Sequence, residues 1–129
     1  MRKLFIILGS FLLASTLAAA QKEAPKGLGV EKAVVATGVE NREPVGVAKE
    51  FDASVGQVYC WTRVISATVP TTIKHVWYVD NQKVFEIPLD IKYPRTRTWS
   101  SKTIKPGNWR VDVTDESGTV LTSVSFTVK

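Results

Sequence analysis

The amino-acid sequence predicts an all-β fold: a single Ig-like antiparallel β-sandwich of seven to eight strands that follows a cleaved signal peptide. Apolar and polar residues alternate along most of the chain after residue 32, which is the period of a β-strand. Turn-forming residues recur about every 10–13 positions, and the i, i+3, i+4, i+7 spacing of an amphipathic helix is missing from this region. A sandwich is favoured, and a small barrel is the alternative.

The first residues have the three-part pattern of a secretory signal peptide. Residues 1–3 are Met-Arg-Lys, residues 4–17 are mainly apolar, and residues 18–20 are alanines that offer small side chains to a signal peptidase. The apolar run is shorter than the roughly 20 residues of a membrane span. We therefore expect cleavage after Ala20, a periplasmic or secreted location and no stable membrane insertion afterwards. An uncleaved N-terminal anchor is the alternative.

The rest of the chain is expected to hold one domain. Residues 21–32 are polar and contain proline and glycine, so they are interpreted as a flexible linker. Residues 33–129 are assigned to the β-sandwich. Cys60 is the one cysteine, so no internal disulfide can form, and a lone thiol in an oxidising compartment is expected to be a small buried core residue.

Eight segments have strand patterns, and turn residues separate them. They are residues 33–39, 45–51, 57–65, 73–79, 83–91, 95–104, 109–113 and 120–128. In the third segment alternation predicts that Val58, Cys60, Thr62 and Val64 face one way and Tyr59, Trp61, Arg63 and Ile65 the other. In the fourth, His75 shares a face with Trp77. Residues 80–82, 105–108 and 116–118 predict tight turns, because they combine Asp, Asn, Pro, Ser and Gly.

Composition and motifs exclude several functions. The net charge of +5 falls to +3 when the signal peptide, which contains Arg2 and Lys3, is removed. This excess of positive charge is too small to indicate nucleic-acid binding. The chain has no HExxH, CxxC or GxSxG motif and no phosphate-binding loop. One histidine and one cysteine cannot form an ordinary zinc site. We therefore expect no enzymatic activity, no catalytic residue, no metal and no cofactor.

Tryptophans and arginines provide the candidate binding residues. Trp77 and Trp109 are expected in the core, whereas Trp61 and Trp99 each lie two positions from an arginine on the same strand face, which permits cation–π contact. Exposed rings beside guanidinium groups would bind a sugar, a peptide or an anionic polymer. The candidate ligand-binding residues are Arg97, Trp99, Ser101, Arg95, Arg110, His75, Trp61 and Arg63.

A structural interpretation of the same residues stays open. Arginine stems can simply cover the sheet surface, and basic side chains can form a solvated face. The serines beside Trp99 can bond strand-end backbone. His75 is then a half-buried residue that donates a hydrogen bond to a backbone carbonyl.

The second half of the chain resembles a known bacterial family, domain of unknown function 2914. The resemblance is carried, in order and spacing, by residues 58–64 (VYCWTRV), 75–78 (HVWY), 97–102 (RTWSSK), 107–113 (GNWRVDV), 118–121 (GTVL) and 126–128 (FTV). It extends over residues 33–129. It implies a small extracytoplasmic β domain without an established activity, so the family supplies no functional residues.

Together these observations predict a non-catalytic exported binding module. Its partner would be a protein or a cell-envelope glycan or other anionic polymer, bound near residues 95–102 with help from Arg110 and His75. The alternatives are a hydrolase of an envelope polymer, which would need a pocket at His75, and a structural accessory subunit.

Overall fold

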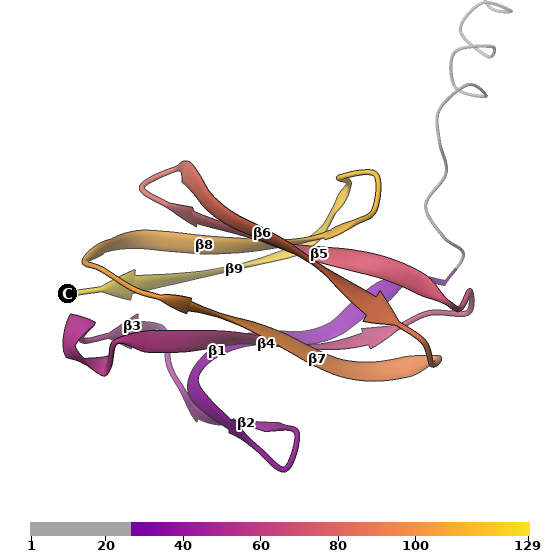
Figure 1. Cartoon of the computed structure of the whole chain (residues 1–129), viewed down its shortest axis with the longest axis horizontal. Coiled ribbons are helices and arrows are strands. Elements are labelled where there is room, and N and C mark those ends of the chain that lie inside the picture. The colour runs from indigo at the N-terminus through magenta and orange to yellow at the C-terminus, as the bar shows by residue number, and fades with distance from the viewer. Residues whose placement is uncertain (1–26) are drawn as a thin grey trace, which may run out of the picture.

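The computed structural model describes residues 27–129, which form two β-sheets packed face to face (Figure 1). The predicted signal peptide and residues 21–26 of the predicted linker lie outside the described residues. The described part of the chain has nine strands and one short 3₁₀ turn, Ala53–Val55. The predicted β-sandwich is confirmed, with nine strands in place of the seven to eight expected. No helix within residues 27–129 is long and apolar enough to cross a membrane.

The first sheet has four strands in the order β2-β1-β4-β7, all antiparallel neighbours. Its strands are β1 (Gly29–Glu40), β2 (Glu43–Val47), β4 (Gln57–Ile65) and β7 (Arg95–Thr103). Strand β1 begins at Gly29, which pairs with Ile65, and so it starts before the expected boundary at residue 33. The pairing supplies partners for backbone groups that a flexible linker would have left to water.

The second sheet has five strands in the order β3-β9-β8-β5-β6. Its strands are β3 (Glu50–Phe51), β5 (Thr71–Val79), β6 (Gln82–Ile91), β8 (Gly107–Asp115) and β9 (Val120–Val128). All neighbours are antiparallel except β3, which runs parallel to β9. The hairpin predicted at residues 80–82 is confirmed: Asp80 and Asn81 have φ of 50° and 66°, the conformation of a type I′ turn.

The segment 45–51, predicted as one strand, is divided between the two sheets. Ala48 still donates to Val35 of the first sheet, but Lys49 accepts from Thr127 of the second. Phe51 explains the crossing, because its ring is buried against Phe126 at 5.8 Å between ring centroids. Burying a phenylalanine stabilises by about 1.5–3 kcal/mol, which outweighs continuation of a short edge strand.

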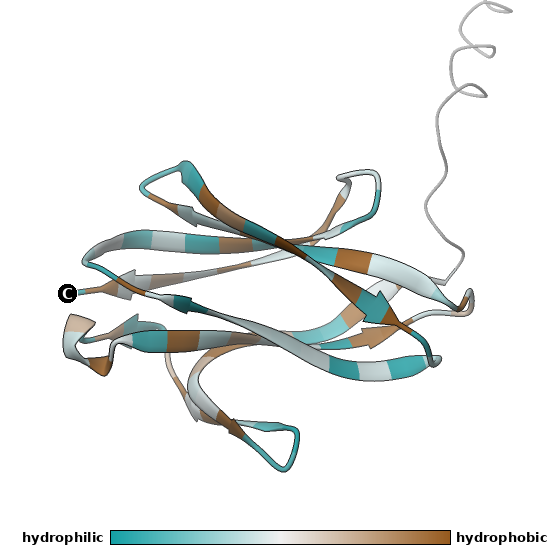
Figure 2. Ribbon diagram, viewed as in Figure 1, coloured by the Kyte–Doolittle hydropathy of each residue, from teal (hydrophilic) through white to brown (hydrophobic). Residues whose placement is uncertain are grey.

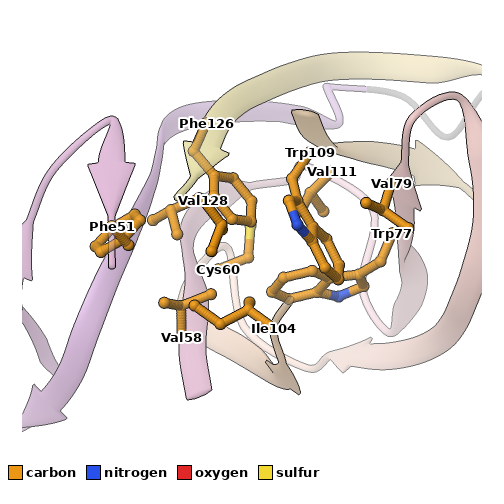
Figure 3. Close-up of a cluster of buried hydrophobic side chains, with 11 residues drawn as sticks. Phe51, Val58, Cys60, Trp77, Val79, Ile104, Trp109, Val111, Phe126 and Val128 are labelled. Carbon is orange, nitrogen blue, oxygen red and sulfur yellow. The ribbon is translucent and has the colours of Figure 1, made fainter. Parts of the chain in front are cut away.

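The hydrophobic core lies between the two sheets in two clusters. Figure 2 shows hydrophobic and hydrophilic residues alternating along the strands, as the sequence predicts. The larger cluster holds Trp77 and Trp109, whose rings meet edge to face at 6.3 Å, and Phe126 stacked on Trp109 at 5.7 Å (Figure 3). The smaller contains Val64, Ile73, Ile91 and Val113. The predictions that Cys60, Trp77 and Trp109 are core residues are confirmed.

A layer of buried polar side chains separates the two clusters. Thr62 lies on β4 between Cys60 and Val64, and His75 lies on β5 between Ile73 and Trp77, so the two polar residues face each other across the sandwich. His75 and Thr62 both have 0% exposed surface. His75 is therefore more buried than the half-buried position we expected, and its partners are hydroxyl groups instead of a backbone carbonyl.

The donors and acceptors of this layer form one directional chain. The hydroxyl of Thr62 donates its one hydrogen bond to the carbonyl of Thr98 at 2.8 Å, so it accepts from His75 Nε2 at 3.3 Å. The imidazole is then neutral, and its bare Nδ1 accepts from Ser100 Oγ at 2.6 Å. Ser100 Oγ in turn accepts from Trp77 Nε1 at 3.1 Å. Every group in this chain is satisfied, which is the condition for burying polar atoms without a large penalty.

The structure predicts an acid-sensitive contribution from His75. Burial lowers the pKa of His75 from 6.5 to about 4, because a charged imidazolium is poorly solvated in the core. Between these values the unfolded chain binds a proton that the folded chain does not. Stability is therefore complete above pH 6.5 and falls as pH drops towards 4, by up to about 3 kcal/mol.

Urea unfolding at a series of pH values between 4 and 7 would measure this loss in the wild type and in His75→Gln, which cannot titrate. The other titrating groups contribute equally to both proteins, so the difference between the two free energies of unfolding reports His75 alone. This difference should shrink as pH falls, because only the wild type loses the contribution of His75. Parallel curves would show that His75 has the same pKa in the folded and unfolded chain, and this would contradict the prediction.

Candidate functional site

The outer face of the four-stranded sheet carries two matched cross-strand pairs. Trp61 of β4 lies directly opposite Trp99 of β7, and Arg63 lies directly opposite Arg97. Two like charges at directly opposed positions of an antiparallel pair normally destabilise a sheet. The pairing therefore concentrates positive charge at a cost to stability.

The β1–β2 hairpin lies over this face. It projects from the four-stranded sheet on the side away from the five-stranded sheet (Figure 1). Its two turn residues, Asn41 and Arg42, have φ of 51° and 65°, as a type I′ turn requires. The second position of such a turn favours glycine, so an arginine there is held in a conformation that costs about 1 kcal/mol.

Arg42 joins the hairpin to the sheet through three contacts. Its carbonyl accepts a hydrogen bond from Trp61 Nε1 at 3.0 Å. Its guanidinium donates to the carbonyl of Arg97 at 3.1 Å and lies over the Trp99 ring, 5.6 Å from the centroid. Trp61 is left with 0% exposed surface. The hypothesis that Trp61 offers an exposed ring to a ligand is therefore wrong, and one face of the half-buried Trp99 is occupied.

Four arginines and one glutamate line a polar pocket of about 400 Å³ on this face: Arg42, Glu43, Arg63, Arg95 and Arg97. Beside it, Glu31 Oε1 accepts from Nε of both Arg63 (3.1 Å) and Arg95 (3.0 Å). Glu43 Oε2 accepts from Arg97 Nη1 at 2.6 Å. The four arginines therefore have two carboxylates near them, which leaves an excess of positive charge. We call the five lining residues, Arg42, Glu43, Arg63, Arg95 and Arg97, the arginine pocket.

The structure brings together part of the predicted site. Arg63, Arg95 and Arg97 line the arginine pocket, and Trp61 and Trp99 lie beside it under Arg42. The expected contact between Arg63 and Trp61 is present, with the guanidinium 5.9 Å from the ring centroid. The expected partner of Trp99 is replaced, because Glu43 holds Arg97 and Arg42 covers the ring instead.

The other predicted residues do not join the pocket. Ser101 shares the outer face of β7 but does not line the pocket. Arg110 belongs to the five-stranded sheet, where it stacks on Tyr78 at 4.1 Å and pairs with Asp112 at 3.0 Å. His75 lies inside the sandwich. Neither Arg110 nor His75 can join the pocket, because β5 and β8 belong to the five-stranded sheet and the pocket lies on the outer face of the four-stranded sheet.

Sequence reasoning missed Glu31, Arg42 and Glu43. Glu31 lies in the segment interpreted as a linker, and the other two lie at the β1–β2 turn. Asn41 between two β-branched segments is only part of a hairpin signal, because the Asn-Gly pair that indicates a two-residue turn is replaced by Asn-Arg. Nothing local in the sequence indicates that the hairpin lies over β4 and β7.

The chemistry available at the pocket is recognition of an anion. Guanidinium groups donate paired hydrogen bonds to carboxylate and phosphate oxygens. Cys60 is buried in the core, where desolvation raises the pKa of its thiol to about 12, so it is not poised as a nucleophile. In the described part of the chain, no group of three or more His, Cys, Asp or Glu residues is arranged to hold a metal ion.

Comparison with known proteins finds a family similarity over part of the chain. No curated protein matches the chain. The family model described as "Protein of unknown function (DUF2914)" matches residues 70–128. The match is shorter than the expected 33–129 and includes β5 to β9, so it covers Arg95, Arg97 and Trp99 but not β4 or the β1–β2 hairpin. Residues 70–128, a little under half of the chain, are therefore similar to the DUF2914 family, whose function is unknown.

Proposed function

We propose that the protein is a non-catalytic, exported binding module that recognises an anionic group of a partner protein or a cell-envelope polymer. The observation that carries this proposal is the arginine pocket: its four guanidinium groups have only two carboxylates near them, Glu43 in the pocket and Glu31 beside it. A carboxylate or phosphate group that enters the pocket would neutralise part of the excess positive charge, and its oxygens would accept paired hydrogen bonds. Export through the predicted signal peptide would place the pocket outside the cytoplasm.

The cost of building the pocket supports a role in binding. Arg63 and Arg97 are opposed like charges, and Arg42 holds a backbone conformation that favours glycine. The ion pairs that offset this repulsion are largely solvent-exposed, and exposed pairs contribute only about 0–1 kcal/mol each. Stability alone would be served better by uncharged residues at these positions.

Two further observations favour binding over hydrolysis. The imidazole of His75 has 0% exposed surface and both of its nitrogens are occupied, so it is not offered to a substrate. Four of the five residues that line the pocket are arginines, whose guanidinium groups only donate hydrogen bonds, and the fifth, Glu43, is paired with Arg97.

Arg42→Gly is the sharpest single test of the pocket. The variant creates an Asn-Gly pair, which a type I′ turn prefers, and the bond from Trp61 to the backbone carbonyl of residue 42 remains. We therefore expect a folded protein whose affinity for citrate at low ionic strength is about tenfold weaker, because one charged donor is gone. Isothermal titration calorimetry measures the affinity, and circular dichroism checks the fold.

Lys83→Gln is the matched control, because it removes one exposed positive charge from β6 of the other sheet. It should leave citrate affinity within about twofold of wild type, a change of less than about 0.5 kcal/mol. Equal losses in both variants would mean that citrate responds to net charge alone, and the pocket would not be a binding site.

Glu43→Gln should act in the opposite direction. It releases Arg97 from the carboxylate that now occupies one of its amino groups, and it adds one unit of positive charge to the pocket. Citrate affinity is expected to rise several-fold, with a change in unfolding free energy below about 1 kcal/mol because the pair is exposed. A fall in affinity would contradict the proposal.

A further inference from the structure

Strand β7 is an edge of the four-stranded sheet whose backbone is open to pairing. It pairs with β4 on one side and has no strand on its other side within residues 27–129. Its nine residues contain no proline, and its register with β4 is regular from end to end. Edge strands are usually short, interrupted by proline, bulged or charged, so that other chains do not pair with them. Of these features β7 has only its charges, which are all positive.

The other three sheet edges carry such protection. Strand β2 is short and contains Pro44 and Gly46, and β3 has only two residues. Strand β6 contains Pro88, and its pairing with β5 has a register irregularity near Trp77. Among the edges that the structure describes, β7 is therefore the one most open to a further strand.

The hydrogen-bonding direction of β7 follows from its two ends. Ser66 N donates to Pro94 O just before the strand, and Ile104 N donates to Gly56 O just after it. Hydrogen-bonded and non-bonded pairs alternate in an antiparallel ladder, so even-numbered residues of β7 point their amides and carbonyls at β4. The outward amides belong to Arg95, Arg97, Trp99, Ser101 and Thr103.

The side chains of the same odd-numbered residues lie on the outer face with the arginine pocket. Arg95 and Arg97 are two positions apart, which is about 6.7 Å along a strand. The carboxylates of a strand with acidic residues at alternate positions have the same spacing, so they would meet these two arginines in turn. A second copy of β7 would instead bring arginines against arginines, and like charges on neighbouring strands repel.

We propose that β7 is a docking edge for an extended, acidic segment of a partner protein, which adds to the sheet as a fifth strand. This proposal rests on the proposed function, because it uses Arg95 and Arg97 of the same pocket and names the partner. Backbone hydrogen bonds to the outward groups of β7 supply the pairing, and alternate carboxylates enter the arginine pocket. A backbone amide of the incoming strand replaces Arg42 as the donor to the carbonyl of Arg97. The guanidinium of Arg42 is then free to bind a carboxylate.

The test uses the wild-type protein and three blocked peptides as long as β7. The first alternates glutamate and threonine. The second has the same sequence with the backbone N-methylated along the edge that would face β7, so it keeps the charges but cannot form the ladder. The third has lysine for glutamate. We expect the first peptide to bind at least about tenfold more tightly than either of the others.

Amide hydrogen exchange gives a signature that charge attraction alone would not produce. Binding of the first peptide should slow exchange at Arg97, Trp99 and Ser101, whose amides point outward, while the alternate amides keep the protection that they have from β4. Ser101→Pro removes one outward amide and no bond to β4, so it should lose the peptide yet still bind citrate. Retained citrate binding also shows that the variant is folded.

Each other outcome overturns the inference. Equal affinity for the first and second peptides, or binding without protection at the odd-numbered residues, means attraction to the pocket without strand addition. Binding of polygalacturonate but of none of the peptides means that an acidic polymer is the ligand; the proposed function would then stand. Failure of peptides, polygalacturonate and citrate alike would overturn both proposals.

Discussion

The pairing of β4 with β7 determines both the interior and the outer surface of the four-stranded sheet. Successive residues of each strand point to opposite faces, so one register settles both sets of neighbours. On the inner face it brings Thr62 and Ser100 within reach of His75. On the outer face it aligns Trp61 with Trp99 and Arg63 with Arg97. A slip by one residue would bury arginines and expose the polar layer.

The two faces make opposite use of polar groups. Inside, each donor from Trp77 Nε1 to the carbonyl of Thr98 has one acceptor, and the neutral imidazole completes the chain. That arrangement holds the two sheets in one alignment and leaves no spare hydrogen-bonding group. Outside, the arginines outnumber their carboxylate partners, and one carboxylate oxygen of Glu31 serves two guanidinium groups. Charged donors at a surface can exchange their water partners for a ligand, whereas an unpaired donor in a core is costly.

The hairpin between β1 and β2 makes the outer face a pocket. Without it, the Trp61 ring would be exposed and the arginines of β4 and β7 would form an open stripe. The Trp61 indole bonds to the backbone carbonyl of Arg42, so the position of the hairpin depends on a tryptophan of β4, the strand next to β1 in the sheet. Folding of the core and formation of the pocket are therefore coupled through the same strand, β4.

Alternation in the sequence was sufficient to predict the sandwich, most of its strands and the inward residues Val58, Cys60, Thr62 and Val64, because the period of two directly reflects which face is buried. It also predicted that Arg63 lies beside Trp61. It could not show that Trp61 is covered, that Glu43 takes Arg97, or that Phe51 draws its segment to the other sheet. Each of these contacts joins residues far apart in the chain, where local periodicity carries no information.

The most direct measurement is a nuclear magnetic resonance titration of the arginine Nε–H groups with citrate at low ionic strength. Saturable shifts of Arg63, Arg95 and Arg97, with Arg110 unmoved in its contacts with Tyr78 and Asp112, are the predicted result. Arg110 has the same charge on the other sheet, so it reports non-specific attraction. If the signals of Arg63, Arg95, Arg97 and Arg110 all shift together and do not saturate, the result would contradict an anion site on the β4–β7 face.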